Sequence, residues 1–181
     1  GSNHNVAVMT DGTLWAWGSN NEGQVGDGTQ STRPSPVQLS LATDWAVVAA
    51  GDLHSMAIRA NGTLWGWGSS FYGQLGIGTS GLNVRSLDPA PVGSATNWLT
   101  VAPGLAHTVA TRSDGTLWAW GRSDYGQLGM GNNADLLVPT QVGIASTWTV
   151  AAAGDSHSVG LRLNESLFAW GRNLDGQVGD G

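Results

Sequence analysis

Apolar and polar residues alternate over short stretches of this chain, which predicts β-strands. Residues 54–59, HSMAIR, alternate in this way. In residues 13–18, TLWAWG, Trp15 and Trp17 fall on one face of the predicted strand, and Leu14 and Ala16 on the other. No segment longer than a turn or two carries the helical period, so the sequence predicts an all-β protein.

Turn signals separate these predicted strands. The pairs Asp11-Gly12, Asn61-Gly62 and Asp114-Gly115 favour a tight hairpin turn, because both residues take positive φ readily. A glycine-rich turn such as YGQLGIG (72–78) and a proline-bearing segment follow the second strand. A further strand beginning with Trp is predicted at 45–50, 98–103 and 148–153. About four strands are therefore expected before the pattern restarts.

The whole pattern repeats along the chain. Trp15, Trp65, Trp118 and Phe168 are separated by 50, 53 and 50 residues. The repeat units are 1–50, 51–103, 104–153 and a partial unit at 154–181, which together form one propeller segment over residues 1–181. Four strands at a period near 50 are typical of β-propeller blades. The expected fold is an all-β propeller with about three and a half four-stranded blades per chain.

The unit GDLHSMAIRANGTLWGWGSSFYGQLGIG (51–78) resembles the regulator of chromosome condensation repeat, in the form common in bacterial proteins. The resemblance implies a seven-bladed β-propeller. It also implies varied functions, since members include an exchange factor for a nuclear GTPase, a plant ultraviolet-B photoreceptor and a bacterial inhibitor of β-lactamases. The photoreceptor's sensing tryptophans follow the glycine that opens a unit. Here those positions hold other residues, which argues against that function: Ser2, Asp52, Leu105 and Asp155.

Composition narrows the classes of partner. No run of about 18 apolar residues occurs, so no membrane span is predicted. The chain has no Lys, and its seven Arg are scattered along a sequence of net charge -6, which disfavours nucleic acid. The absence of Cys excludes disulfides and thiolate sites. An acidic, lysine-free, glycine-rich chain is typical of an exported bacterial protein, which favours an extracellular or periplasmic location.

Residues of catalytic or metal-binding type occur at repeated positions, which favours structural roles. The four His stand once per unit in the pattern G-x-x-H, and a ring of successive blades is too wide for them to reach one metal ion: His4, His54, His107 and His157. The turn GQVGDG (23–28) is not followed by a helix, so it lacks the amides that cradle phosphate. No carboxylate pair or nucleophile motif is present. We expect no catalytic, metal or cofactor site.

Positions that differ between units are the candidates for function. The loop from Gly78 to Pro89 is three residues longer than its counterparts in the first and third units. Aromatic and Arg side chains on rigidly held loops favour protein binding. Leu136 and Leu137 are exposed if residues 132–138 form a surface loop. The predicted partner-binding residues are Phe71, Tyr72, Leu82, Arg85, Leu87, Asp124, Tyr125, Leu136 and Leu137.

The expected function is a non-enzymatic β-propeller scaffold that binds a protein or peptide through these loops. One alternative is an exchange factor for a small GTPase, although the only insertion is three residues long and no basic tail is present. Another is a secreted enzyme-inhibitor-like protein, or a hydrolase. Three and a half units do not close a ring, so either a homodimer completes the propeller or the chain is a segment of a longer one.

Overall fold

The computed structural model describes residues 1–181 as fourteen strands in four antiparallel sheets. The first sheet holds β1 (His4–Val8), β2 (Leu14–Gly18) and β3 (Arg33–Gln38). The second holds β4 (Trp45–Ala50), β5 (His54–Arg59), β6 (Leu64–Ser69) and β7 (Arg85–Pro91). The third holds β8 (Trp98–Pro103), β9 (His107–Arg112), β10 (Leu117–Gly121) and β11 (Leu136–Gln141). The fourth holds β12 (Trp148–Ala153), β13 (His157–Arg162) and β14 (Leu167–Gly171).

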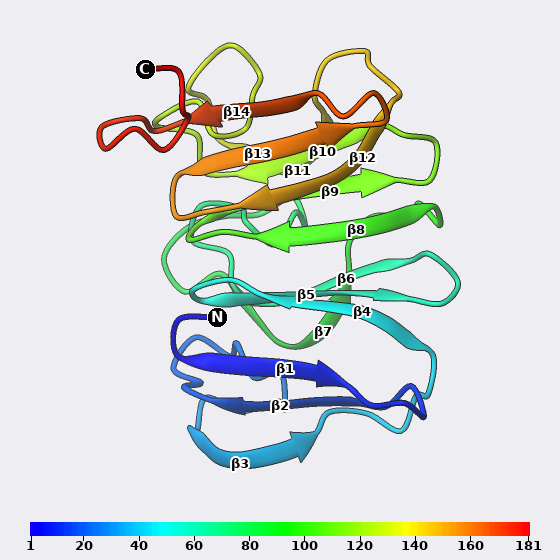
Figure 1. Ribbon diagram of the computed structural model, residues 1–181. Coiled ribbons are helices and arrows are strands. Elements are labelled where there is room, and N and C mark those ends of the chain that lie inside the picture. The colour runs from blue at the N-terminus through cyan, green and yellow to red at the C-terminus, as the bar shows by residue number, and fades with distance from the viewer.

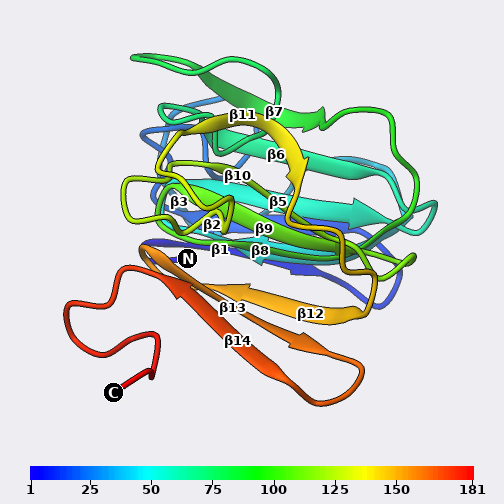
Figure 2. The same cartoon turned by 90° about the horizontal axis from the view of Figure 1, so that it is seen from above.

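The sheets follow one another as blades, from β1–β3 at the bottom of Figure 1 to β12–β14 at the top. Seen from above, the sheets lie face to face and the segment after β14 extends away from them (Figure 2). Two sheets have four strands and two have three. The predicted all-β propeller with about three and a half blades is confirmed.

The sheets are offset from the sequence repeats. Strand β4 ends the first repeat unit, yet it pairs with β5 of the second unit, with Ala50 opposite Ser55. Strands β8 and β12 pair with the following unit in the same way. Each complete sheet therefore takes its first strand from one unit and its other three from the next. This offset ties consecutive units together through main-chain hydrogen bonds.

The hairpin turns differ from the predicted type. The glycines have positive φ, with Gly12 at 79° and Gly62 at 76°, but the Asp or Asn before them does not. The expectation of positive φ at both residues is therefore wrong. The Asp11 carboxylate instead accepts hydrogen bonds from the Thr13 amide at 3.0 Å and the Thr13 hydroxyl at 2.7 Å. Asp11 thus holds the turn through its side chain, as Asx turns do.

The hydrophobic core lies between the sheets and not in one central mass. At the first junction, buried Leu14 of the first sheet belongs to one cluster with Trp45, Ala57 and Trp67 of the second sheet. Two further clusters of this kind join the second sheet to the third and the third to the fourth. Most of the repeated tryptophans therefore serve to pack one blade on the next.

A buried set of polar groups joins the first two sheets. The main-chain carbonyl oxygen of Gln24 accepts hydrogen bonds from Trp67 Nε1 at 2.9 Å and from Ser55 Oγ at 2.8 Å. The His4 Nε2 atom lies 2.8 Å from Ser55 Oγ. Because the single hydroxyl hydrogen of Ser55 is used on Gln24, Ser55 must accept from His4, whose proton is then on Nε2. The structural role predicted for His4 therefore requires the tautomer that carries its proton on Nε2.

The same polar set recurs at the other two junctions, with the same atoms and similar distances. Its members are Gln74, His54, Thr108 and Trp120 at the second, and Gln127, His107, Ser158 and Trp170 at the third. The glycine turn makes the approach possible. Gly26 has φ +84°, and a Cβ there would lie 2.5 Å from Trp67 Cδ1. A larger residue would therefore push Trp67 away from its acceptor.

The buried histidines should make stability depend on pH. Burial lowers the pKa of His4 to about 4, of His54 to about 3 and of His107 to about 4. Between pH 6.5 and about 4, the unfolded chain takes up protons that the folded protein does not. The free energy of unfolding should therefore fall as the pH is lowered, by up to about 1.4 kcal/mol per pH unit for each histidine. Urea unfolding at several pH values measures this slope.

The variant His54→Gln is the control for this measurement. It removes one titrating group, so the slope should shrink by roughly one third even if the variant is less stable. The hydrogen bond from Thr116 lowers the pKa of Asp114 below its ordinary 3.8, so protonation of carboxylates in the unfolded chain also lowers stability near that pH. The histidine slope is therefore measured above about pH 5, where these carboxylates stay ionised. A stability that is flat from pH 7 to about 5 would contradict the assignment of neutral, buried histidines.

Candidate functional site

A pocket of about 400 Å³ opens at the end of the sheets that carries the long loops. We call it the Tyr72 pocket. Its walls come from Phe71 and Tyr72 after β6, from residues 81–85 in the loop that is three residues longer, and from Arg122 after β10. Pockets of this size and origin, on loops held by a rigid scaffold, are typical of binding sites.

The aromatic wall is fixed by Arg122 of the next sheet. The rings of Phe71 and Tyr72 meet edge to face with centroids 4.6 Å apart. The Arg122 guanidinium carbon lies 4.5 Å from the centroid of the Tyr72 ring, and Arg122 Nε donates to Asp124 Oδ1 at 2.8 Å. This hydrogen bond raises the pKa of Arg122 and lowers that of Asp124. Arg122 is therefore a fixed cation across the junction between two sheets.

Arg85 fastens the inserted loop to the first sheet's glycine turn. Its Nη1 lies 3.4 Å from Glu22 Oε2 and donates to the Asn21 carbonyl at 3.3 Å. Its Nη2 donates to Asn83 Oδ1 at 2.9 Å, and Asn83 has φ +67°. Asn tolerates this left-handed conformation better than most residues, so the loop turns here at small cost. Residues 81–85 are thereby positioned over the pocket.

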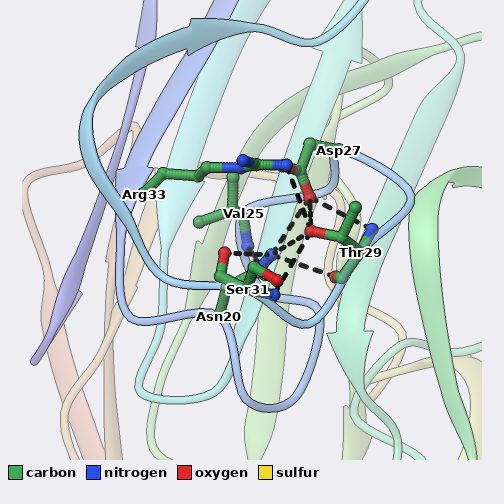
Figure 3. A network of polar contacts seen from close by, with 6 residues as sticks. All are labelled: Asn20, Val25, Asp27, Thr29, Ser31 and Arg33. Carbon is green, nitrogen blue, oxygen red and sulfur yellow. Dashed lines mark hydrogen bonds and ion pairs between the residues drawn. The ribbon is translucent and has the colours of Figure 1, made fainter.

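The corresponding loop of the first sheet is closed by one side chain. Buried Asn20 donates through Nδ2 to Asp27 Oδ1 at 3.0 Å and to the Thr29 and Ser31 carbonyls at 3.0 and 3.2 Å, while its Oδ1 accepts from the Val25 amide (Figure 3).

Ser70 takes the place of Asn20 in the second sheet, and its hydroxyl reaches only the Thr79 carbonyl. The longer second loop lacks this central amide and is the one that lines the Tyr72 pocket.

The pocket combines apolar surface with one unpaired charge. Leu82 is 81% exposed and Phe71 is 41% exposed at its rim, and Leu53 and Leu105 contribute to its walls. The Asp52 carboxylate also lines the pocket and makes no ion pair, whereas Arg85 and Arg122 are paired with Glu22 and Asp124. The free charge in the pocket is therefore negative.

The structure brings together four of the nine predicted partner-binding residues: Phe71, Tyr72, Leu82 and Arg85. Asp124 reaches the pocket only through Arg122. Tyr125 lies outside it and is 46% exposed, with the Arg172 guanidinium carbon 5.8 Å from its ring centroid.

The three remaining residues belong to the scaffold. A Cβ on Gly23 would lie 2.6 Å from Leu87 Cδ2, and a Cβ on Gly73 would lie 2.6 Å from Leu137 Cδ2. Leu87 and Leu137 therefore pack each outer strand on the glycine turn of the preceding sheet. Leu136 begins β11 and packs against two core clusters. The expectation that Leu136 and Leu137 are exposed on a surface loop is wrong.

Sequence reasoning missed Arg122, although a signal for it was present. The same position holds Ser19, Ser69 and Arg172 in the other units, so it differs between units as the chosen positions do. Glu22 and Asp52 were also missed as lining residues. No group of three or more His, Cys, Asp or Glu is placed to hold a metal ion, and no helix is long and apolar enough to cross a membrane.

Comparison with known proteins identifies the repeat. The model of the regulator of chromosome condensation (RCC1) repeat matches residues 11–58, 61–111 and 114–161, which is most of the chain. This protein belongs to the RCC1 repeat family. The predicted family is thereby confirmed, and a second RCC1 repeat model matches 45–74, 100–127 and 149–177.

A relative with a known function supports the assignment to this family. The chain is 34% identical over 137 residues to the ultraviolet-B receptor UVR8 of Arabidopsis thaliana, which is 75% of this chain and 31% of that protein.

Two solved structures share the fold. Prp20p from Saccharomyces cerevisiae matches with a TM-score of 0.88 and 23% identity over all of this chain and 46% of that one, and human WBSCR16 with 0.82 and 23% over 93% and 45%. The RCC1-repeat chain thus spans less than half the length of these relatives.

Two of the predicted partner-binding residues allow a matched test, because Leu137 packs between two sheets and Leu82 is exposed. Leu137→Ala should lower the free energy of unfolding by about 1–3 kcal/mol, because it removes packing between two sheets. Leu82→Ala should change it by less than about 0.5 kcal/mol, since Leu82 is exposed. Chemical denaturation of both variants measures this. Equal losses would contradict the separation of the two residues into scaffold and surface.

Proposed function

We propose that this RCC1-repeat protein is a non-enzymatic scaffold whose Tyr72 pocket binds a short segment of a protein or peptide. The observation that carries the proposal is the pocket itself, which is formed where two sheets and the one inserted loop meet. Phe71, Tyr72 and the residues of the inserted loop come from positions that vary between units, so they are free of the packing constraint on the repeat.

The apolar part of the pocket suits one large apolar side chain. Phe71 is partly exposed and Leu82 is largely exposed, and both lie beside the other apolar side chains that line the pocket. Burying such a side chain there would remove apolar surface from water on both partners. The aromatic wall needs little further ordering, because Arg122 and Asp124 already hold it. Preorganised aromatic anchors of this kind are typical of binding hot spots.

The charges favour a basic neighbour to that anchor. Asp52 is the unpaired charge of the pocket, and the chain as a whole carries a net charge of -6. A Lys or Arg next to the apolar anchor would pair with Asp52, and the overall field would attract such a segment. The proposed occupant is therefore an extended segment with an apolar anchor flanked by a basic residue.

The exchange-factor alternative draws on one relative. The structure of Prp20p is described together with its binding properties to Gsp1p and histones. A role of that kind here would require a GTPase partner, and release of fluorescent GDP from a candidate GTPase would reveal it. The Tyr72 pocket does not depend on this alternative, because it needs only a complementary segment.

Peptide selection tests the proposal directly. A displayed library of random peptides is selected on the wild-type protein, and affinities of enriched peptides are measured by fluorescence polarisation. We expect an apolar residue beside Lys or Arg in the enriched sequences. Phe71→Ala and Asp52→Asn should each weaken binding by about tenfold, which corresponds to loss of an anchor or of a charge pair.

Ile144→Ser is the matched control, because Ile144 is 99% exposed and lies in the connection between β11 and β12, at the opposite end of the sheets. It should leave the affinity unchanged. Enriched peptides that bind equally to wild type, Phe71→Ala and Asp52→Asn would overturn the proposal. Selection of acidic peptides would overturn the assignment of the charge.

We also propose that a second copy of the chain covers the outer face of the fourth sheet. Leu167 is 72% exposed there, while the equivalent Leu14, Leu64 and Leu117 are at most 1% exposed between sheets. Light scattering on a sizing column should then give a mass near twice 18.7 kDa. Leu167→Glu should return it to the monomer. A wild-type monomer would refute this second proposal and leave the pocket proposal untouched.

A further inference from the structure

In three sheets an Arg at the hairpin end, away from the Tyr72 pocket, lies against two aromatic rings that meet each other edge to face. The guanidinium carbon of Arg112 lies 4.3 Å from the centroid of the Trp98 ring and 3.6 Å from that of Trp118. Arg59 lies against Trp45 and Trp65, and Arg162 against Trp148 and Phe168, at 4.3 to 4.5 Å. Three of the seven Arg that looked scattered in the sequence therefore occupy one repeated position.

The Arg112 guanidinium lacks the nearby carboxylate that Arg59 has, and Arg162 lacks one as well. Arg59 Nε lies 3.7 Å from Asp44 Oδ1, and the position of Asp44 is taken by Asn97 in the third sheet. No carboxylate oxygen lies within 4 Å of Arg112, and Asp114 acts on it only from farther away. Burial lowers the pKa of Arg112, while the charge of Asp114 acts in the opposite direction. A partly buried cation without a counter-ion is a ready partner for an anion.

The neighbouring indole also lacks its usual partner. In the second sheet, Trp45 Nε1 donates to Ser40 Oγ at 3.2 Å. Gly93 stands five residues before Trp98, where Ser40 stands before Trp45, so that hydroxyl is missing. The Trp98 Nε1 atom is consequently buried without a hydrogen-bond partner, and Arg112 Nε beside it has none either. Trp148 Nε1 and Arg162 Nε of the fourth sheet are unpartnered in the same way. Two unmet donors side by side are unusual in a folded protein.

Arg112 and Trp98 line a second pocket of about 420 Å³, which we call the Arg112 pocket. Its other walls are largely apolar and include Ile77, Pro91 and Val138 from the second and third sheets. An apolar pocket of this size with a single convergent cation matches a small ligand with one acidic group. A planar carboxylate pairs with a guanidinium through two parallel N–H···O hydrogen bonds.

We propose that the Arg112 pocket binds a small organic carboxylate, with its apolar body filling the pocket and its carboxylate paired with the Arg112 guanidinium. This site is separate from the Tyr72 pocket, because the two share no lining residue. The first sheet has Met9 at the equivalent position, and the second sheet neutralises its Arg59 with Asp44.

The test follows the indole N–H signals of the protein by nuclear magnetic resonance while 3-phenylpropionate is added up to roughly 10 mM. The signals of Trp98 and Trp118 should move, and those of Trp45 and Trp65 should not. The neutral amide of the same acid should bind about tenfold more weakly, since it loses the charge-assisted hydrogen bonds. Acetate should also bind more weakly, because it lacks the apolar body.

Three variants distinguish the site from general binding. Arg112→Gln should weaken binding by about tenfold or more, and Arg59→Gln should leave it unchanged. Asn97→Asp keeps Arg112 and replaces the donor to Asp114 Oδ2 with a second carboxylate. The added negative charge beside Arg112 should weaken binding of the acid several-fold. Thermal unfolding of each variant shows whether it is folded. If Arg112→Gln does not fold, the affinity of Asn97→Asp tests the proposal in its place.

Several results would overturn the proposal. They are equal binding of the acid and its amide, equal binding of 3-phenylpropionate and acetate, unchanged affinity in Asn97→Asp, and signals that do not move. A peptide ending in phenylalanine carries the same chemistry at its C-terminus. Binding of that peptide without binding of the free acid would overturn the assignment to a small molecule.

Discussion

The main-chain carbonyl oxygen of Gln24 is the acceptor on which the junction between the first two sheets depends. It accepts hydrogen bonds from the indole N–H of Trp67 and the hydroxyl of Ser55. The Ser55 oxygen in turn accepts a hydrogen bond from the Nε2–H group of His4. These groups are buried, so a group left without its hydrogen-bond partner would lower the stability of the fold. Because the set recurs at each of the three junctions, one local arrangement orients every sheet against its neighbour. Burial lowers the pKa of the three junction histidines to about 3 or 4, so they are neutral near pH 7.

This arrangement separates the residues that hold the propeller from those that vary. The glycine turn must pass close to a Trp ring of the next sheet, so its sequence is nearly the same in all units. The segments on either side of it are free to differ. At the loop end, differences at Phe71, Tyr72 and the inserted loop produce the Tyr72 pocket. At the hairpin end, Asn97 and Gly93 replace Asp44 and Ser40 and leave Arg112 and Trp98 uncompensated.

Comparison of units along the sequence located part of the candidate site. It found Phe71, Tyr72, Leu82 and Arg85, because their positions differ between units and carry side chains suited to binding. It also named Leu87 and Leu137, which occupy the same position in two units and pack on the glycine turns of the preceding sheets. It missed Arg122 because the sequence does not show that this side chain crosses to Tyr72 of the preceding sheet. Contacts between sheets join residues about 50 positions apart, and strand alternation carries no information on them.

The sequence by itself determined the all-β class, the repeat, the family and the number of blades, because these follow from periodicity and from turn residues that act locally. The tertiary structure alone decided how the units are joined. It showed that each sheet borrows its first strand from the preceding unit, and that the Gln24 carbonyl is shared by two side chains of the next sheet. It also revealed which Arg is paired and which is not. Hydrogen bonds and ion pairs depend on distances of a few ångströms between distant segments, and only the packed sheets set those distances.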